Sequence, residues 1–567
     1  MAMRMMASAV LLAGAILVAG AVDAVAAPAA RYDLVIAGGH VIDGTGSPWY
    51  AADVGIRDGR IAAIGRLPRD AARRVIDVHG QVVAPGFIDM LGQSELALLV
   101  DPRAPSKIHQ GITTEITGEG ESAAPLDARM AERHRLEYQR LGIHADWQTL
   151  AQYFARLRRQ GIGINFATYV GATSVREAVV GYDDRAATPE ELARMQQLVE
   201  EAMRQGAMGV SSSLEYPPAP YASTEELIAL ARAAARHGGI YATHMRSEGD
   251  GMVAALEETF RIGREASIPV EIWHLKVAGH RNWGTMPDVV ARIEAARTSG
   301  VDVSANTYAY TAWSNSMSAF VPPWAHSGGD GELLKRLADP ATRARIRADM
   351  AADTDAWDNE WREISGPGDV LVCATYHDEL RRYQGMRLDA IAAEWHEDPL
   401  DALLDLLARD EARTEVAVFG MDEPDVALAL RQPWVSVDND SSAASPEGVL
   451  GGFHPHPRAY GTFPRILARY VREQHLLSLP DAIRKFSALP AQKLGLADRG
   501  VIKQGMQADL VVFDPATVRD LATYEAPNQL SAGMDYVIVN GVPVIDAGKM
   551  TGKLPGQVLL GPGYPRH

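Results

Sequence analysis

Cysteine is almost absent from this sequence, and so is any concentration of positive charge. The only cysteine among 567 residues is Cys373, which excludes an internal disulfide framework and any cysteine-rich zinc motif. In the apolar stretch DVLVCATY it is expected to pack as a small buried hydrophobic side chain. Lys and Arg total 55 against 72 Asp and Glu, a formal net charge of −17. No Lys/Arg cluster forms a phosphate-binding stripe, so nucleic acid is not expected as a partner.

The composition is that of a large globular chain. Hydrophobic residues make up 47% and charged residues 22% of the sequence. This length and balance suit a barrel domain together with a smaller second domain.

Residues 1–27 differ from everything that follows. Arg4 precedes an apolar run from Met5 to Val22, and Ala24-Val25-Ala26 is a small-x-small cleavage pattern. These features predict a secretory signal peptide and a periplasmic or secreted protein, without stable membrane insertion once the leader is cleaved. An uncleaved membrane anchor is the alternative, because the apolar run is long for a signal core.

The two ends of the remaining chain show the same sequence pattern. DLVIAGGHVIDGTG and DVGIRDGRIAAIG near the N-terminus, and QADLVVFDP and MDYVIVNGVPVIDAGK near the C-terminus, are short apolar strands separated by Gly, Asp-Gly and Asn-Gly turns. Such patterns are typical of hairpins. Residues 28–80 and 495–567 are therefore predicted to build one small β-sandwich domain from both chain ends.

Between these ends, strands alternate with helical stretches. ITTEIT, INFATYV, AMGVSSS, GIYATH, PVEIWH and VDVSANTY are separated by segments such as PEELARMQQLVEEAMRQG. This alternation predicts an α/β fold, a parallel (β/α)8 TIM barrel over residues 81–494, opened by the strand in VVAPGFIDMLGQSE. Residues 310–416 are too long for a loop between the seventh and eighth strands and predict a helical insertion, or lid, over the barrel mouth.

Candidate metal ligands stand at strand ends, where barrel enzymes place their chemistry. His244 and His274 close successive strands thirty residues apart, and Glu119 and Glu121 follow an earlier strand. One carboxylate and two imidazoles complete the ligand set of a catalytic zinc that keeps one position open. Glu119 is the preferred carboxylate because it comes sooner after its strand, with Glu121 as the alternative.

Asp438 follows the eighth predicted strand, in VSVDNDSSAASP. A carboxylate there could take a proton from water and return it to a leaving nitrogen. A turn aspartate is the alternative, because Asp-Asn-Asp is also turn-forming composition. The position after the eighth strand favours the acid–base role.

Six ordered segments resemble the N-acyl-D-amino-acid deacylases of the amidohydrolase superfamily, over about residues 31–562. They are SSLEYPPAPYAS, YATHMRSEG, HLKVAGHRNWG, TYAYTA with VPPWAHSGG, HPHPRAYGTFPR, and DRGVIKQGMQADLVVFDPATV. The resemblance implies an amidohydrolase-type barrel in which His244 and His274 bind zinc and Asp438 is the acid and base. It further implies that Lys276, Arg458 and Tyr216 hold a substrate carboxylate and that Tyr308 contacts the substrate. The planar fork of Arg458 suits that role, and Lys276 adds a point charge.

The sequence departs from that family at the metal site. The family's first strand carries His-x-His and its second loop carries Gly-Asn-Cys-Gly, whereas this chain has Leu91, Gln93 and Gly118-Glu119-Gly120-Glu121. Leucine has no donor atom and a neutral amide is a poor zinc ligand. One metal per chain is therefore expected, zinc or another divalent ion, held by Glu119, His244 and His274.

The predicted function is metal-dependent hydrolysis of a C–N amide bond in a small carboxylate-bearing substrate, such as an N-acyl-D-amino acid. A dipeptidase is the nearest alternative, in which Glu121 or Glu95 would bind a free amine, and a cyclic amide hydrolase is another. A different class of protein, a metal-free binding protein on a decayed barrel, would have no reason to keep His244, His274 and Arg458 together.

Overall fold

The computed structural model describes residues 31–354 and 356–565. The leader predicted at residues 1–27 lies outside this range. Within it, none of the helices is both long and apolar enough to cross a membrane.

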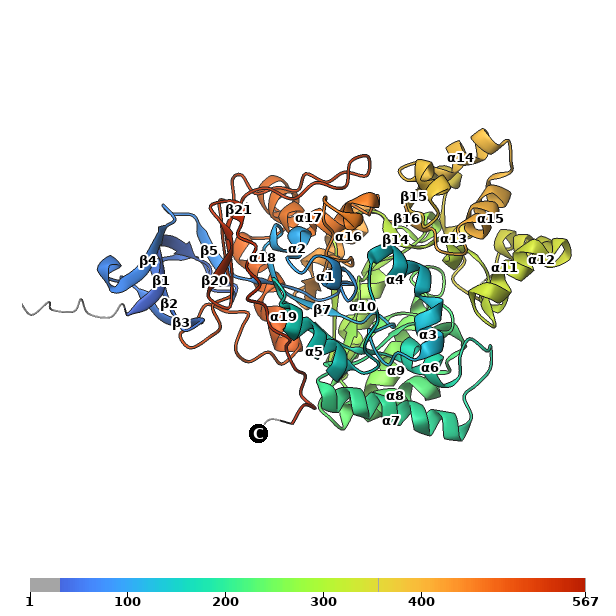
Figure 1. The fold of residues 1–567 in the computed structure, drawn as a ribbon, viewed down its shortest axis with the longest axis horizontal. Helices are drawn as coiled ribbons and strands as arrows, with labels where there is room; N and C mark the ends of the chain where they lie inside the picture. The colour runs from blue at the N-terminus through green and yellow to red at the C-terminus, as the bar shows by residue number, and fades with distance from the viewer. Residues whose placement is uncertain (1–30, 355, 566–567) are drawn as a thin grey trace, which may run out of the picture.

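Strands from the N-terminal and C-terminal parts of the described chain form one sheet-rich domain (Figure 1). Nine strands form one hydrogen-bonded sheet in which C-terminal β18 pairs with N-terminal β5. Along β1, Leu34 and Ile36 pack in one apolar cluster while Val35 and Ala37 pack in another, so alternate residues cover opposite faces. The strands are β1 (Tyr32–Val41), β2 (Tyr50–Arg57), β3 (Arg60–Gly65), β4 (Ala72–Asp77), β5 (Val82–Pro85), β18 (Leu510–Phe513), β19 (Met534–Val539), β20 (Val542–Asp546) and β21 (Lys549–Met550).

The boundaries of this domain differ from those predicted. Val82–Pro85 was expected in the first barrel strand but belongs to the sheet, and the barrel begins after Gly86 with β6 (Phe87–Asp89). The chain passes from the sheet into the barrel at Gly86. Only glycine fits at this point, because a Cβ there would lie 2.2 Å from Thr113 Oγ1. The end of the chain also leaves the sheet, since Pro555 and Val558 form bridges to the barrel residues Ile162 and Phe166.

Eight parallel strands close the predicted barrel. Hydrogen bonding runs from β6 to β8 and, through β9 (Val170–Gly171), from β10 to β17, and a bridge between Gly92 and Ser441 joins the first strand to the last. The expected (β/α)8 fold with a separate sheet-rich domain is confirmed. The barrel strands after β6 are β7 (Ile112–Thr117), β8 (Asn165–Thr168), β10 (Gly209–Ser213), β11 (Ile240–His244), β12 (Val270–Ile272), β13 (Val303–Thr307) and β17 (Val435–Val437).

Helices cover the outside of the barrel. In α7, Thr188 and Glu191 form a capping box, Pro189 occupies the first turn, and Gly206 ends the helix in a left-handed conformation. Its apolar face buries Met195, Val199, Ala202 and Met203 at helical spacing. The principal covering helices are α5 (Leu150–Gln160), α6 (Ala172–Val179), α7 (Pro189–Gln205), α8 (Thr224–Ala235), α9 (Met252–Ala266), α10 (Met286–Thr298), α16 (Glu423–Arg431), α17 (Arg458–Arg465), α18 (Leu479–Phe486) and α19 (Ala488–Lys493).

Two inserted segments shape the space beside the site. The first, between β7 and β8, contains α3 (Ala128–Arg133) and α4 (Arg135–Leu141). The second, between β13 and β17, forms the lobe that projects at the right of Figure 1. Its three-stranded sheet has the order β14-β16-β15. The lobe comprises β14 (Trp313–Ser316), α11 (Asp330–Ala338), α12 (Pro340–Ala351), α13 (Glu360–Glu363), β15 (Val370–Ala374), α14 (Leu388–Trp395), α15 (Pro399–Arg409) and β16 (Glu415–Val418).

Candidate active site

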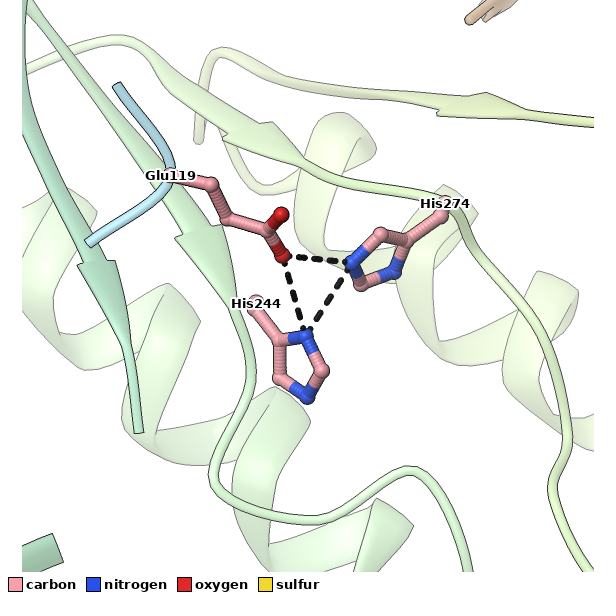
Figure 2. Close-up of side chains that lie close together, drawn as sticks. All are labelled: Glu119, His244 and His274. Atoms are coloured by element: carbon pink, nitrogen blue, oxygen red, sulfur yellow. Dashed lines mark hydrogen bonds and ion pairs between the residues drawn. The ribbon is translucent and has the colours of Figure 1, made fainter. Parts of the chain in front are cut away.

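Glu119, His244 and His274 converge on one point at the barrel mouth (Figure 2). Glu119 Oε1 lies 3.2 Å from His244 Nδ1 and 3.0 Å from His274 Nε2, and the two nitrogens are 3.1 Å apart. A tetrahedral zinc ion with bonds of about 2.0–2.1 Å needs ligand atoms only slightly farther apart than this. The three donor atoms therefore fit one small divalent metal ion.

The backbone holds each of these three side chains at the mouth. His244 is the last residue of β11, and His274 follows β12 with a positive φ of 34°. Such a conformation is costly for a residue with a side chain and is typical of functional sites. Glu119 stands between Gly118 and Gly120, both at positive φ, and a Cβ on Gly120 would lie 2.5 Å from Ser213 Cβ.

Two further carboxylates face the outer nitrogens of the histidines. Glu215 Oε2 lies 2.8 Å from His244 Nε2, and Glu248 Oε1 lies 3.0 Å from His274 Nδ1. Glu215 favours the tautomer that carries a proton on His244 Nε2 and leaves His244 Nδ1 free as a ligand. At His274 Nδ1 the hydrogen-bond partner is Lys276 Nζ, 2.8 Å away, which also donates to Glu248. Glu215, His244 and Glu248 form a second possible ligand set. If Glu215 instead accepts the proton on His244 Nε2, the set of Glu119, His244 and His274 remains complete.

The electrostatics of the cluster favour added positive charge. Burial opposes protonation of His244, yet Glu248, Glu119 and Glu215 together raise its pKa well above the ordinary value. Burial likewise opposes ionisation of Glu248, but Lys276, His244 and His274 hold its pKa well below the usual range. A bound cation satisfies the same surplus of carboxylates.

Asp440, rather than Asp438, lines the site cavity. Asp440 Oδ2 lies 2.7 Å from Arg458 Nη1, and burial, reinforced by Glu119 and opposed by Arg458, raises the pKa of Asp440. Asp438 is fully buried, and neither of its carboxylate oxygens has a hydrogen-bond partner among the described residues. Burial raises its pKa well above the usual range, with Asp440 and Asp89 adding to the effect. Asp440, two residues after Asp438, is therefore the carboxylate of this segment that reaches the cavity.

Leu91 and Gln93 have different surroundings. Leu91 is fully buried in the apolar cluster that contains Ile116 and Trp273. Gln93 Nε2 donates to Glu119 Oε2 at 2.8 Å and to Asp440 Oδ1 at 3.1 Å. Of the two positions where the family's metal-binding histidines are missing, Leu91 therefore packs in the apolar core and Gln93 bridges Glu119 and Asp440 by hydrogen bonds.

Of the four residues predicted to bind substrate, three reach the cavity and one does not. Arg458, Lys276 and Tyr216 line the cavity, whereas Tyr308 does not. Tyr308 is buried, and the Arg458 guanidinium lies 4.8 Å above its ring, so Tyr308 supports Arg458 rather than facing the cavity.

The three cavity-lining residues differ in how many of their polar atoms already have hydrogen-bond partners. Lys276 Nζ donates to Glu248 Oε2 at 2.5 Å. Tyr216 packs edge-on against His244 with ring centres 5.0 Å apart. Arg458 Nη2 donates to the Ser314 carbonyl, while its Nε has no hydrogen-bond partner among the described residues. Arg458 therefore retains donor capacity that Lys276 has largely used.

The cavity has a volume of about 640 Å³. It contains the metal-ligand cluster and is bounded by the β7–β8 insertion and by the strands of the lobe. Glu121 and Glu95 both line it. Cys373 also lies on its wall, although its side chain is buried and the pKa of its thiol is raised to about 12 by burial.

Sequence reasoning missed Asp440, Gln93, Glu215 and Glu248 as members of the site. Glu215 stands just beyond β10, so the strand-end rule that selected His244 would also have selected it. Glu248 lies four residues after His244 in HMRSEG, with no helical or strand pattern to orient it.

Comparison with known proteins finds similarity along nearly the whole chain. A sequence profile described as an amidohydrolase family matches residues 446–545, which include Arg458. D-aminoacylase of Alcaligenes xylosoxydans xylosoxydans is 40% identical over 529 residues, covering 93% of this chain and 97% of that protein.

Two solved structures are similar over the same extent. N-acyl-D-glutamate deacylase from Bordetella bronchiseptica, solved with zinc and a phosphonate mimic of the tetrahedral intermediate, is 35% identical with a TM-score of 0.77, covering 93% of this chain and 99% of that one. A D-aminoacylase is 38% identical with a TM-score of 0.76, covering 93% and 100%. That structure is described with a binuclear metal centre in which one metal activates and the second attenuates.

Proposed function

Since this chain belongs to the D-aminoacylase and N-acyl-D-amino-acid deacylase family of amidohydrolases, we propose that it hydrolyses N-acyl-D-amino acids. Water is consumed, the amide C–N bond breaks and a C–O bond forms. The products are a carboxylic acid and a free D-amino acid. The substrate is a small carboxylate-bearing amide.

Different residues of the cavity would bind the metal ion, transfer the proton and hold the substrate carboxylate. Glu119, His244 and His274 would hold a divalent metal ion, which supplies a Lewis acid for the amide carbonyl and for water. Asp440 takes a proton from the attacking water and passes it to the leaving nitrogen. Arg458 receives the substrate carboxylate through its unoccupied donors, a planar fork suited to that group.

One row of contacts carries this proposal. Arg458 Nη1 lies 2.7 Å from Asp440 Oδ2, Asp440 Oδ1 lies 3.1 Å from Gln93 Nε2, and Gln93 Nε2 lies 2.8 Å from Glu119 Oε2. The row places an anion-binding group, an acid–base group and the metal-ligand cluster in the order that an amide with a terminal carboxylate requires.

We propose one metal ion per chain, with zinc as the first expectation and another divalent ion as the alternative. The proposal rests on the fit of Glu119, His244 and His274 to one ion, and on Leu91 being apolar packing. Gln93 already uses its amide to bridge Glu119 and Asp440.

The dipeptidase alternative finds less support. Glu121 is paired with Arg133 at 3.4 Å. Burial raises the pKa of Glu95 to about 7, so this group offers only a partial negative charge to an amine at neutral pH. The apolar N-terminal segment favours export, and we propose a periplasmic or secreted location.

A stereochemical panel tests the activity. Metal-loaded protein is incubated with N-acetyl-D- and N-acetyl-L-amino acids of acidic, neutral and basic side chain, with D-containing dipeptides and with cyclic imides, and the released amine is quantified. Turnover of D but not L forms is expected. Turnover confined to dipeptides or cyclic imides, or none at all, would overturn the proposal, and binding without turnover would favour a binding protein.

A further inference from the structure

One lysine of the barrel is completely buried between two carboxylates. Lys107, on the short helix α2 (Pro105–Ile108), is 0% exposed. Its Nζ lies 2.8 Å from Asp89 Oδ2 and 2.8 Å from Glu115 Oε1. Asp89 is the last residue of β6, and Glu115 is its partner in the neighbouring strand β7. Lys107 therefore offsets the repulsion between two carboxylates that the strand register brings side by side.

Lys107 keeps its charge in these surroundings. Burial opposes the charged form, but Asp89 and Glu115 together raise the pKa of Lys107 above its ordinary value. An ammonium group has three protons to donate and accepts none. Its contacts are therefore strong, charge-assisted hydrogen bonds to every oxygen that it reaches.

The same ammonium also binds the segment that carries Asp440. Lys107 Nζ donates to Asn439 Oδ1 at 2.7 Å and to the Ser441 carbonyl oxygen at 2.7 Å. These two residues precede and follow Asp440 in the chain. Asp89 adds a contact, because its Oδ1 accepts a hydrogen bond of 2.9 Å from the Asn439 backbone nitrogen. Lys107 and Asp89 thus hold the residues on both sides of Asp440.

The backbone of Asp440 is strained and needs this support. Its φ is 46°, a left-handed conformation that is costly for a residue with a side chain and persists only where the surroundings enforce it. In this conformation the carboxylate lies 2.7 Å from Arg458 Nη1 and 3.1 Å from Gln93 Nε2. A backbone that relaxed to negative φ would turn the carboxylate away from both groups.

Backbone hydrogen bonds to the first strand hold the segment as well. The Asp440 nitrogen donates to the Leu91 carbonyl at 2.9 Å, and the Gln93 nitrogen donates to the Ser441 carbonyl at 3.2 Å. These bonds do not depend on any side chain. The contacts of Lys107 are therefore the part of the support that a substitution can remove while the strand pairing remains.

We propose that Lys107 is a positioning residue for Asp440, and that through Asn439 and Ser441 it holds the strained backbone that directs the Asp440 carboxylate into the cavity. This inference rests on the proposed acid–base role of Asp440. A reacting group displaced by about 1 Å can lose about 10²-fold in rate. Loss of this hold should therefore slow the proton transfer and lower kcat much more than it changes KM or metal content.

Asn439→Leu tests the contact without leaving a buried charge unpaired. Asn439 Nδ2 has no hydrogen-bond partner among the described residues, so the side-chain contact that is lost is the one with Lys107. For the N-acyl-D-amino acid that is hydrolysed fastest, kcat should fall by about 10- to 100-fold with KM changed by less than about threefold. Asn165→Leu should keep the wild-type kcat, because this fully buried asparagine begins β8, at the end of the barrel opposite the mouth.

A second variant removes the ammonium itself. Lys107→Met alone would leave two buried carboxylates without a partner and destabilise the fold. Lys107→Met/Glu115→Gln removes one positive and one negative charge together and should lower kcat as Asn439→Leu does. Glu115→Gln alone keeps the ammonium and an oxygen that can accept from it, so its kcat should stay within about threefold of wild type. Thermal denaturation and elemental analysis confirm that each variant is folded and carries its metal.

A double-mutant cycle with Asp440→Asn separates positioning from general damage to the fold. If Lys107 acts through Asp440, adding Asn439→Leu to the Asp440→Asn protein should lower kcat by less than about twofold further. An equal fall in both backgrounds, or a wild-type kcat in Asn439→Leu or in Lys107→Met/Glu115→Gln, overturns the positioning role. A wild-type kcat in Asp440→Asn, or no turnover by the wild-type protein, is a failure of the proposed function, and the positioning role fails with it.

Discussion

Gln93 Nε2 donates to Glu119 Oε2 at 2.8 Å and so holds the carboxylate that faces both histidines. The same nitrogen reaches Asp440 Oδ1 at 3.1 Å. Gln93 therefore positions a predicted metal ligand and a predicted acid–base group with a single amide.

Gln93→Leu should weaken metal binding and lower kcat, because Glu119 loses the donor that orients it. Loss of an outer contact to a metal ligand commonly reduces metal affinity or activity by about 10- to 100-fold. Competition against a metallochromic chelator measures the affinity. Gln557→Leu, an exposed glutamine outside the cavity lining, serves as the control, and unchanged affinity in Gln93→Leu would contradict this role.

Asp440→Asn should reduce kcat by about 10²- to 10⁴-fold, the usual contribution of a general acid–base group. Asp438→Asn should cost much less, because Asp438 does not line the cavity. Steady-state kinetics on variants with verified metal content compare the two. A larger loss in Asp438→Asn would return the acid–base role to that residue.

Glu215→Gln and Glu248→Gln should each weaken metal binding by about 10- to 100-fold, because Glu215 accepts the proton on the outer nitrogen of His244 and Glu248 holds Lys276 beside the outer nitrogen of His274. The same chelator competition applies. Glu225→Gln, at an exposed surface ion pair with Arg261, should leave the affinity unchanged. Wild-type affinity in both cavity variants would show that the histidines need no such partners.

Asp358 predicts how stability depends on pH. Burial, with Glu215 and Glu248 adding to it, raises the pKa of Asp358 to about 7. The folded protein then keeps a proton that an unfolded aspartate, with a pKa of about 3.9, has released. The contribution of Asp358 to the free energy of unfolding therefore decreases as pH rises from about 4 to 7.

Asp358→Asn should remove part of this dependence and raise Tm at pH 8 relative to wild type. The amide can keep both partners, accepting from Glu248 N and donating to Ser247 Oγ. Thermal denaturation from pH 5 to 8 measures the effect, with the exposed Asp70→Asn as control. A wild-type Tm that rises steadily over this range, and a variant that parallels it, would contradict the assignment.

The sequence predicted the parts of this site that obey a periodic rule. Hydrophobic runs followed by polar residues identified the barrel strands, and barrel geometry placed His244, His274 and Glu119 at one mouth. Because the strand-end rule depends on an exact end point, it was less reliable for the eighth strand. β17 ends at Val437, yet the residue that reaches the cavity is Asp440, which has a positive φ of 46° and whose amide bonds to the Leu91 carbonyl.

Features set by distant contacts could not be read from the sequence. Tyr308 ends its strand like a site residue, but Arg458 covers its ring. β5, which ends at Pro85, belongs to the nine-stranded sheet because it pairs with β18, a strand that lies more than 400 residues away in the chain. Such pairings have no local pattern, so the predicted boundary at residue 80 was wrong.

The central claim is one metal ion per chain, held by Glu119, His244 and His274. Elemental analysis by plasma mass spectrometry of purified wild-type protein and of Glu119→Ala, after dialysis against metal-free buffer, tests it most directly. The account predicts close to one tightly bound divalent metal per wild-type chain and nearly none in Glu119→Ala. Two metals per wild-type chain, or full metal content in the variant, would contradict it.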